Sequence, residues 1–240
     1  ENRALAGQDA ARDGANAIRE LLAKQEWVNI IFAAAPSQND TLAALFQEPD
    51  IDWTRCRAFH MDEYVGFPKE KKESFGNYLY EHVFGKLPFG EVHYVGGDNP
   101  DPEAECERYN QLIKELGGID LQLLGIGGNA HIGFNEPCDE FVKGTHLVTL
   151  EEDTREANAR FFTSIDEVPT QAYTMGIENI MSAKKILLLA NGKAKAQAVY
   201  DTCFGPVKPQ VPASILQLHA DCIVIADEDA LSLCTEKGLI

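Results

Sequence analysis

The sequence predicts an α/β protein whose sheet is mostly parallel and covered by helices on both faces. Short apolar runs alternate with helical stretches along the chain, and the runs are apolar at successive positions rather than at every second one. Strands of that kind are buried on both faces. No linker, low-complexity segment or repeat divides the 240 residues, which can bury one sizeable core. We therefore expect a single domain over residues 1–240.

The predicted elements follow from periodicity. Apolar runs predict strands at residues 28–34, 119–126, 185–190 and 222–227. A 3.6-residue apolar period predicts helices at residues 9–25, 102–116 and 195–203. Because ligands of open parallel sheets bind beyond the carboxyl ends of the strands, function is expected in the loops that follow the strands. Those loops are residues 33–40, 60–64, 125–137 and 190–195.

The amino-acid composition and the cysteine spacing disfavour membrane, secreted and C-x-x-C metal-binding or redox proteins. Hydrophobic residues make up 45% and charged residues 25% of the chain, as in ordinary globular proteins. No apolar run approaches the roughly 20 residues of a membrane span, and no signal peptide opens the sequence. None of the six cysteines forms a C-x-x-C pair, so we expect free thiols in a reducing cytoplasm. These features predict a cytoplasmic protein.

The net charge of −17 repels nucleic acid and anionic membranes, and no basic stripe offsets it. We therefore expect neither as a partner. An anionic small substrate is repelled in the same way. Any phosphate site has to be built locally, from a few cations and backbone amides.

The glycine-rich stretch GIGGNAHIGFNEP, residues 125–137, allows two interpretations. Its start fits the dinucleotide motif G-x-G-x-x-A, and an acidic cluster follows at residues 150–153. That motif works only if a helix follows the glycines and points its N-terminus at the pyrophosphate. Gly133 and Pro137 interrupt any helix here, which disfavours the interpretation. The alternative is acid–base chemistry by His131, with Glu136 orienting its ring.

A second constellation, AFHMDEYVG at residues 58–66, points to the same end of the sheet. It places Asp62 and Glu63 next to each other. Neighbours in a strand or sharp turn point in opposite directions, so one carboxylate is expected to face the cleft while the other is structural. A metal site of His60, Asp62, His131 and Glu136 carries little weight, because no pair has a recognised ligand spacing.

Several segments together resemble the glucosamine-6-phosphate deaminase (isomerase) family. They are HMDEYVG, ESFGNYLYEHVF, GGIDLQLLGIGGNAHIGFNEP, DTREANARFF, VPTQAYTMGI and PASILQLH, in family order from about residue 27 to 227. The resemblance implies a single Rossmann-like three-layer α/β/α sandwich, no metal and no redox cofactor. It also implies the reaction of an amino-sugar phosphate, glucosamine 6-phosphate, with water to give fructose 6-phosphate and ammonium.

The resemblance also implies residue roles. His131 opens the sugar ring, Glu136 orients and tunes it, and Asp62 shuttles a proton between carbons. An ordinary aspartate is a weak base, so we expect the surroundings of Asp62 to raise its basicity. Arg160 and Lys195 match the phosphate contacts.

Two departures from the family pattern affect this assignment. The first phosphate loop is AAAPSQND instead of a T-G-S-T-P-like sequence, which leaves Ser37 and Gln38 as donors. Asn129 replaces the aspartate two residues before the histidine, as it does in other deaminases.

Three alternatives stay open. A 6-phosphogluconolactonase-type hydrolase shares the fold but needs no enolising base, and a non-catalytic sugar-phosphate sensor needs none either. The third alternative is a deaminase of galactosamine 6-phosphate, which differs from glucosamine 6-phosphate only at carbon 4.

Regulated family members bind an N-acetylated sugar phosphate through a serine and an Arg-x-Lys pair, where this chain has Asp139, His146 and Val148. We therefore expect an unregulated monomer or small homo-oligomer.

Overall fold

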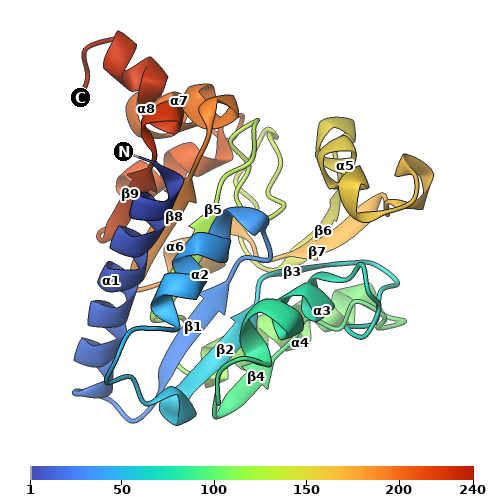
Figure 1. Cartoon of the computed structure of the whole chain (residues 1–240). Coiled ribbons are helices and arrows are strands. Elements are labelled where there is room, and N and C mark those ends of the chain that lie inside the picture. The colour runs from blue at the N-terminus through green and yellow to red at the C-terminus, as the bar shows by residue number, and fades with distance from the viewer. Residues whose placement is uncertain (1) are drawn as a thin grey trace.

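The computed structural model describes residues 2–240 and has a six-stranded parallel sheet at its centre (Figure 1). The strands lie in the order β4-β2-β1-β5-β8-β9, and every neighbouring pair is parallel. Their bounds are β1 (Val28–Phe32), β2 (Cys56–His60), β4 (Glu91–His93), β5 (Leu121–Gly125), β8 (Lys185–Ala190) and β9 (Cys222–Ala226). Counted along the chain, this is the doubly wound order 3-2-1-4-5-6, which reverses direction between β1 and β5.

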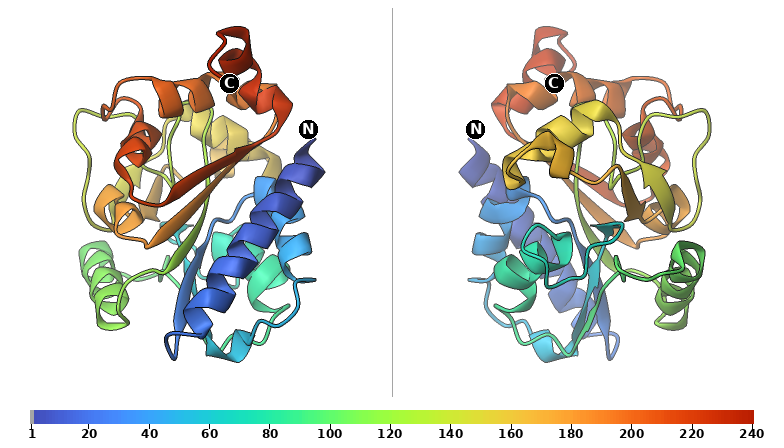
Figure 2. Two further views of the ribbon diagram at one scale, coloured as in Figure 1. Left: turned by 90° about the vertical axis from the view of Figure 1, so that its left-hand side faces the viewer. Right: turned by 90° about the vertical axis from the view of Figure 1, so that its right-hand side faces the viewer.

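Helices cover both faces of this sheet, as Figure 2 shows. One face packs against α1 (Arg3–Leu22), α2 (Asn39–Leu45), α3 (Phe75–Leu79) and the adjoining η3 (Tyr80–Phe84). The other face packs against α4 (Pro102–Glu115), α6 (Ile177–Met181), α7 (Ala196–Phe204) and α8 (Glu228–Glu236). Side chains of β1 alternate between the two cores: Ile30 lies in the first and Ile31 in the second. The predicted three-layer α/β/α sandwich is confirmed.

A second, antiparallel sheet lies beyond the carboxyl ends of the parallel strands. It consists of β3 (Asp62–Tyr64), β7 (Gln171–Thr174) and β6 (His146–Thr149) in that order. The chain between β6 and β7 carries α5 (Glu152–Asn158), which stands clear of the main body in Figure 1. The sequence analysis treated residues 60–64 as a loop, and the structure corrects this. Residues 62–64 pair with β7, so part of the site is held by a sheet.

The remaining short helices are η1 (Pro36–Gln38), η2 (Trp53–Arg55), η4 (Ala159–Phe161), η5 (Ile165–Glu167), η6 (Lys193–Lys195) and η7 (Pro212–Leu218). The predicted strands agree with β1, β5, β8 and β9 to within two residues at each end. The first helix begins at Arg3, six residues before its predicted start, because Asn2 caps it by accepting a hydrogen bond from the Leu5 amide. No helix in residues 2–240 is long and apolar enough to cross a membrane. All six cysteines are free thiols.

Candidate active site

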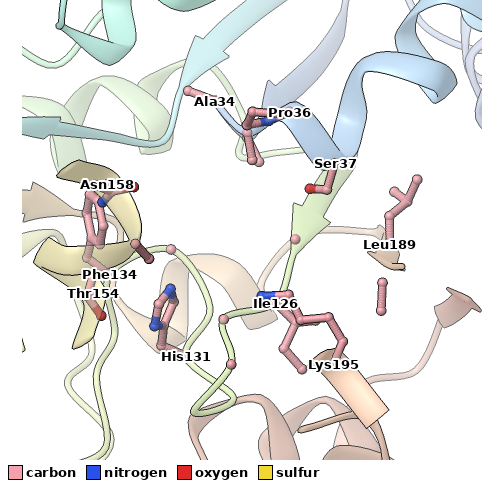
Figure 3. A pocket seen from close by; sticks show the side chains of 18 of the residues that line it. Ala34, Pro36, Ser37, Ile126, His131, Phe134, Thr154, Asn158, Leu189 and Lys195 are labelled. Carbon is pink, nitrogen blue, oxygen red and sulfur yellow. The ribbon is translucent and has the colours of Figure 1, made fainter. Parts of the chain in front are cut away.

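A cavity of about 520 Å³ lies at the point where the strand order reverses (Figure 3). The four loops that the sequence singled out all contribute to its wall, including Ser37 after β1, Asp62 after β2, His131 after β5 and Lys195 after β8. The α5 segment adds Thr154 and Asn158 from the opposite side, so the cavity lies between the main sheet and the smaller one.

Asp62 is the carboxylate that faces this cavity. It is the first residue of β3, pairs with Thr174 of β7 and is 8% exposed. Burial raises the pKa of Asp62 to about 7. A carboxylate with that pKa is a far stronger base than an ordinary aspartate, and about half of the molecules carry it ionised at pH 7. The expected increase in basicity is therefore present, and its cause is desolvation.

The neighbouring carboxylate points the other way. Glu63 is completely buried and accepts hydrogen bonds from the backbone amides of Tyr64 (2.8 Å), Phe75 (3.2 Å) and Gly76 (2.8 Å). It therefore ties β3 to the start of α3. The prediction of one cleft-facing and one structural carboxylate holds, and the alternation of side chains along β3 explains it.

His60 is equally remote from the cavity. It is fully buried, and its Nδ1 accepts a hydrogen bond from the Val95 amide at 3.2 Å. The metal site considered from the sequence required His60 beside Asp62 and His131, and the structure does not bring these residues together. In residues 2–240, no group of three or more His, Cys, Asp and Glu side chains is arranged to hold a metal ion.

His131 lines the cavity, and Glu136 lies behind it. Nδ1 of His131 is 3.4 Å from Oε2 of Glu136, which is 6% exposed. The same oxygen accepts a hydrogen bond from the Asn129 amide at 2.8 Å, and the other carboxylate oxygen accepts one from the Thr154 hydroxyl at 2.5 Å. Burial alone raises the pKa of Glu136, but its contacts with His131, Thr154 and Asn129 outweigh burial and lower it. Glu136 is thus an anion fixed against one nitrogen of the imidazole.

Asn129 stands where the family pattern has an aspartate, and its side chain makes two hydrogen bonds within the loop. Its side-chain oxygen accepts a hydrogen bond from the His131 amide at 3.1 Å, while its NH₂ group donates to Glu136. An aspartate at this position has no proton to donate and would place a second negative charge beside Glu136. The asparagine therefore bridges the histidine backbone and the carboxylate without charge repulsion.

The glycines of this loop make room for the imidazole. A Cβ on Gly127 would lie 2.3 Å from Cε1 and 2.4 Å from Nδ1 of His131. Ala130 adopts a left-handed conformation with φ of 65°, and its amide donates to the Gly127 carbonyl at 3.1 Å. Residues 126–145 contain no helix, so the glycines lack the element that dinucleotide binding requires. Gly127 therefore leaves space for the ring of His131.

Cationic groups gather at another part of the wall. Arg160, at the end of the α5 segment, is exposed, and Lys195, at the end of η6, is half-buried. Burial lowers the pKa of Lys195, and so does the charge of Arg160, which lines the same cavity. Ser37 lies on the wall as well. Two cations and a hydroxyl make a suitable local site for a phosphate.

Gln38 is the one predicted contact that the structure removes from the cavity. It is 1% exposed, is absent from the cavity wall, and its Nε2 lies 3.4 Å from the Leu124 carbonyl. The turn of η1 directs Ser37 toward the cavity and Gln38 against the end of β5. Gln38 therefore packs under the site, and the sequence-based assignment of Gln38 as a phosphate contact is wrong for this structure.

The polar wall residues that the sequence analysis did not assign to the site include Arg3, Thr154 and Asn158. Thr154 and Asn158 lie four residues apart on α5 and so share one helix face, a spacing that the sequence already contained. No sequence signal pointed to Arg3, which reaches the wall from the first turn of α1.

Known proteins resemble this chain in sequence and in fold. The model of the family described as glucosamine-6-phosphate isomerases/6-phosphogluconolactonase matches residues 1–225. A glucosamine-6-phosphate deaminase of Shouchella clausii is 42% identical over 236 residues, covering 96% of each chain. A glucosamine-6-phosphate deaminase of Clostridium botulinum is 49% identical over 198 residues, covering 82% of this chain and 80% of the relative.

The solved structures agree. The structure of a monomeric glucosamine-6-phosphate deaminase superposes with a TM-score of 0.90 at 40% identity and covers 97% of both chains. A 6-phosphogluconolactonase from Thermotoga maritima superposes with a TM-score of 0.73 at 18% identity, covering 92% of this chain and 94% of that one, and shares the fold. By sequence and structure, the chain belongs to the family of glucosamine-6-phosphate isomerases and 6-phosphogluconolactonases.

Proposed function

We propose that this protein deaminates glucosamine 6-phosphate to fructose 6-phosphate and ammonium, with Asp62 as the base that isomerises the sugar. The observation that carries the proposal is a buried carboxylate with a pKa of about 7 in the same cavity as His131 and two cations. A lactonase or a sugar-phosphate sensor has no use for such a base. The deaminases at 42% and 49% identity support the same activity.

His131 is assigned to ring opening. The anomeric hydroxyl must lose a proton and the ring oxygen must gain one, which suits an imidazole because it both accepts and donates near neutral pH. The anion of Glu136 holds Nδ1 as the protonated nitrogen and leaves Nε2 to exchange a proton with the sugar. Asn129 and Thr154 keep the carboxylate in place for this task.

Asp62 is assigned to the carbon-bound proton. In the open-chain aldehyde its carboxylate removes the proton from carbon 2 while the carbonyl oxygen gains a proton, giving an enolamine. The carboxylate then returns its proton to carbon 1, and the amino nitrogen loses one proton as its double bond to carbon 2 forms. The product is a ketimine at carbon 2. Water adds to that ketimine, and the carbon–nitrogen bond breaks to release ammonia, which leaves fructose 6-phosphate. One base on one face of the open chain performs both transfers.

The direct test is the release of ammonium from glucosamine 6-phosphate together with the formation of fructose 6-phosphate. Hydrolysis of 6-phosphogluconolactone without ammonium release would identify a lactonase, and binding without turnover would identify a sensor. Galactosamine 6-phosphate is assayed beside its epimer, because carbon 4 is remote from both proton transfers. The ratio of the two kcat/KM values then defines the sugar.

Replacing Arg160 by alanine is expected to raise the KM for glucosamine 6-phosphate about ten- to a hundredfold, with a much smaller change in kcat. A charge-assisted hydrogen bond contributes about 1.5–3 kcal/mol to binding, and Arg160 is one of the few cations on the cavity wall of a protein whose net charge is −17. Steady-state kinetics measure the effect. An unchanged KM would show that Arg160 is only a surface residue.

The saturation curve is expected to be hyperbolic and insensitive to N-acetylglucosamine 6-phosphate. Asp139 stands where regulated relatives have a serine, and His146 and Val148 replace a basic pair, so a phosphate there meets an added acid and lacks two cations. The deaminase that superposes with a TM-score of 0.90 is described as monomeric. We propose a monomer or small homo-oligomer. A sigmoidal curve that the effector makes hyperbolic would contradict this.

A further inference from the structure

The phosphate end of the cavity has a third cation, the guanidinium of Arg3. Arg3, Arg160 and Lys195 come from the first turn of α1, the α5 segment and the end of η6, which are far apart in the sequence. Burial raises the pKa of Tyr78, while its hydrogen bond with Asn39 and the charges of Arg160 and Arg3 oppose that rise. Both arginines therefore lie within electrostatic reach of one hydroxyl.

The side chain of Arg3 holds the turn after β1. Its Nη2 donates to the Pro36 carbonyl at 2.7 Å, and its Nε pairs with Oδ2 of Asp40 at 2.5 Å. Pro36 opens η1, the turn that presents Ser37 to the cavity. A guanidinium has five N–H donors, so Arg3 has donors beyond these two. Pro36 has no N–H of its own, and the turn offers an anion fewer amides for that reason.

The position of Arg3 is set by close packing between α1 and α2. A Cβ on Gly7 would lie only 2.9 Å from the Cβ of Asp40, so glycine at this position lets the two helices approach. Figure 1 shows α1 beginning at the end of the molecule toward which the parallel strands run. The first turn of α1 is thus fixed beside the loop that follows β1.

We infer that Arg3 is a further phosphate-recognition residue, which orients the Pro36–Gln38 turn and adds a third positive charge for the phosphate of the sugar. The inference rests on the proposed function, because it assigns that end of the cavity to the phosphate group. Arg3 is 44% exposed and is partly neutralised by Asp40, which is 42% exposed, so its contribution is smaller than that of a buried cation.

The first test is Arg3→Ala. It is expected to raise both the KM for glucosamine 6-phosphate and the inhibition constant of inorganic phosphate about three- to tenfold, with kcat within about twofold. Arg12→Ala is the matched control: Arg12 lies on the same helix, pairs with Asp9 at 2.5 Å and is outside the cavity wall. Both variants change the net charge equally, so only a local effect separates them. Thermal unfolding of both variants is measured beside the kinetics, and both are expected to unfold cooperatively as the wild type does.

Asp40→Asn separates phosphate recognition from a structural ion pair. If Arg3 acts on phosphate, removing the competing charge of Asp40 lowers the inhibition constant of phosphate, opposite in sign to Arg3→Ala. If the pair only joins two helices, Asp40→Asn weakens phosphate binding as Arg3→Ala does, and the inference is overturned. Phosphate binding that depends on Arg160 but not on Arg3 also overturns it and leaves the proposed function intact. Ammonium release tests that function separately.

Discussion

The Asp62→Asn variant is expected to lose roughly 100-fold or more in kcat, the contribution typical of a positioned general base. The amide has nearly the shape of the carboxylate but does not accept a proton, so binding of the sugar phosphate changes little. In deuterated water the variant is also expected to stop exchanging the carbon-bound proton. Rapid quench and mass measurement of the sugar detect that exchange. Near-normal exchange would exclude Asp62 as the base.

Asp153→Asn is the matched control for Asp62→Asn. Asp153 also lies on the cavity wall but is exposed on α5, and its replacement removes the same charge without removing the proposed base. Its kcat is expected to stay within about twofold of the wild type, as is usual for a surface substitution. An equal loss in both variants would mean that the charge of the cavity, not a specific base, controls turnover.

The activity is expected to decline as the pH falls below about 7. Burial raises the pKa of Asp62 to about 7, so the carboxylate gains a proton and ceases to act as a base below that pH. At pH 6 only about a tenth of the molecules retain the ionised form, whereas an aspartate with an ordinary pKa near 3.9 would remain ionised. The profile of kcat/KM against pH measures this decline in activity. The phosphate of the substrate is a second group that titrates in this range, near pH 6. A flat profile between pH 5 and 8 would contradict it.

Replacing Gly127 by alanine is expected to lower kcat by about two orders of magnitude, because displacement of a catalytic group by about 1 Å has effects of that size. The added Cβ would lie 2.3 to 2.5 Å from three atoms of the His131 ring. The ring has to move away, and its alignment with Glu136, now 3.4 Å away, is lost. Steady-state turnover of glucosamine 6-phosphate measures the loss.

Gly128→Ala provides the control for that experiment. A Cβ on Gly128 meets no atom within 4 Å among the described residues, although the residue adjoins Gly127 in the same loop. Its turnover is expected to remain close to that of the wild type. Equal activity of the two variants would show that His131 tolerates displacement or has no part in the reaction.

The sequence was most informative where the pattern is local. The apolar runs predict β8 at residues 185–190 without error, because a strand buried on both faces has no polar positions to blur its limits. The same patterns place four loops at one end of the sheet, and all four reach the cavity. His131 and Glu136, only five residues apart, were likewise matched from one stretch of sequence.

The sequence patterns did not predict contacts between segments that are far apart in the chain. The second sheet joins β3 to β7, which is more than 100 residues away, and each of its strands is too short for a periodic signal. Ser37 and Gln38 are neighbours with similar polarity, and only the turn of η1 shows which one faces the cavity. Thr154 reaches Glu136 across 18 residues because α5 folds over the glycine-rich loop.

The sequence by itself determined the fold class, the family, the reaction implied by that family, and the three residues His131, Glu136 and Asp62 to which the chemistry is assigned. Those properties depend on residue identity and short spacing, which a sequence states directly. Only the tertiary structure decided which of the two buried carboxylates faces the cavity and that burial raises the pKa of Asp62, because desolvation depends on every neighbour at once. It separated Asp62 from Glu63, moved Gln38 beneath the site, and brought Arg3 from the first turn of the chain to the phosphate end.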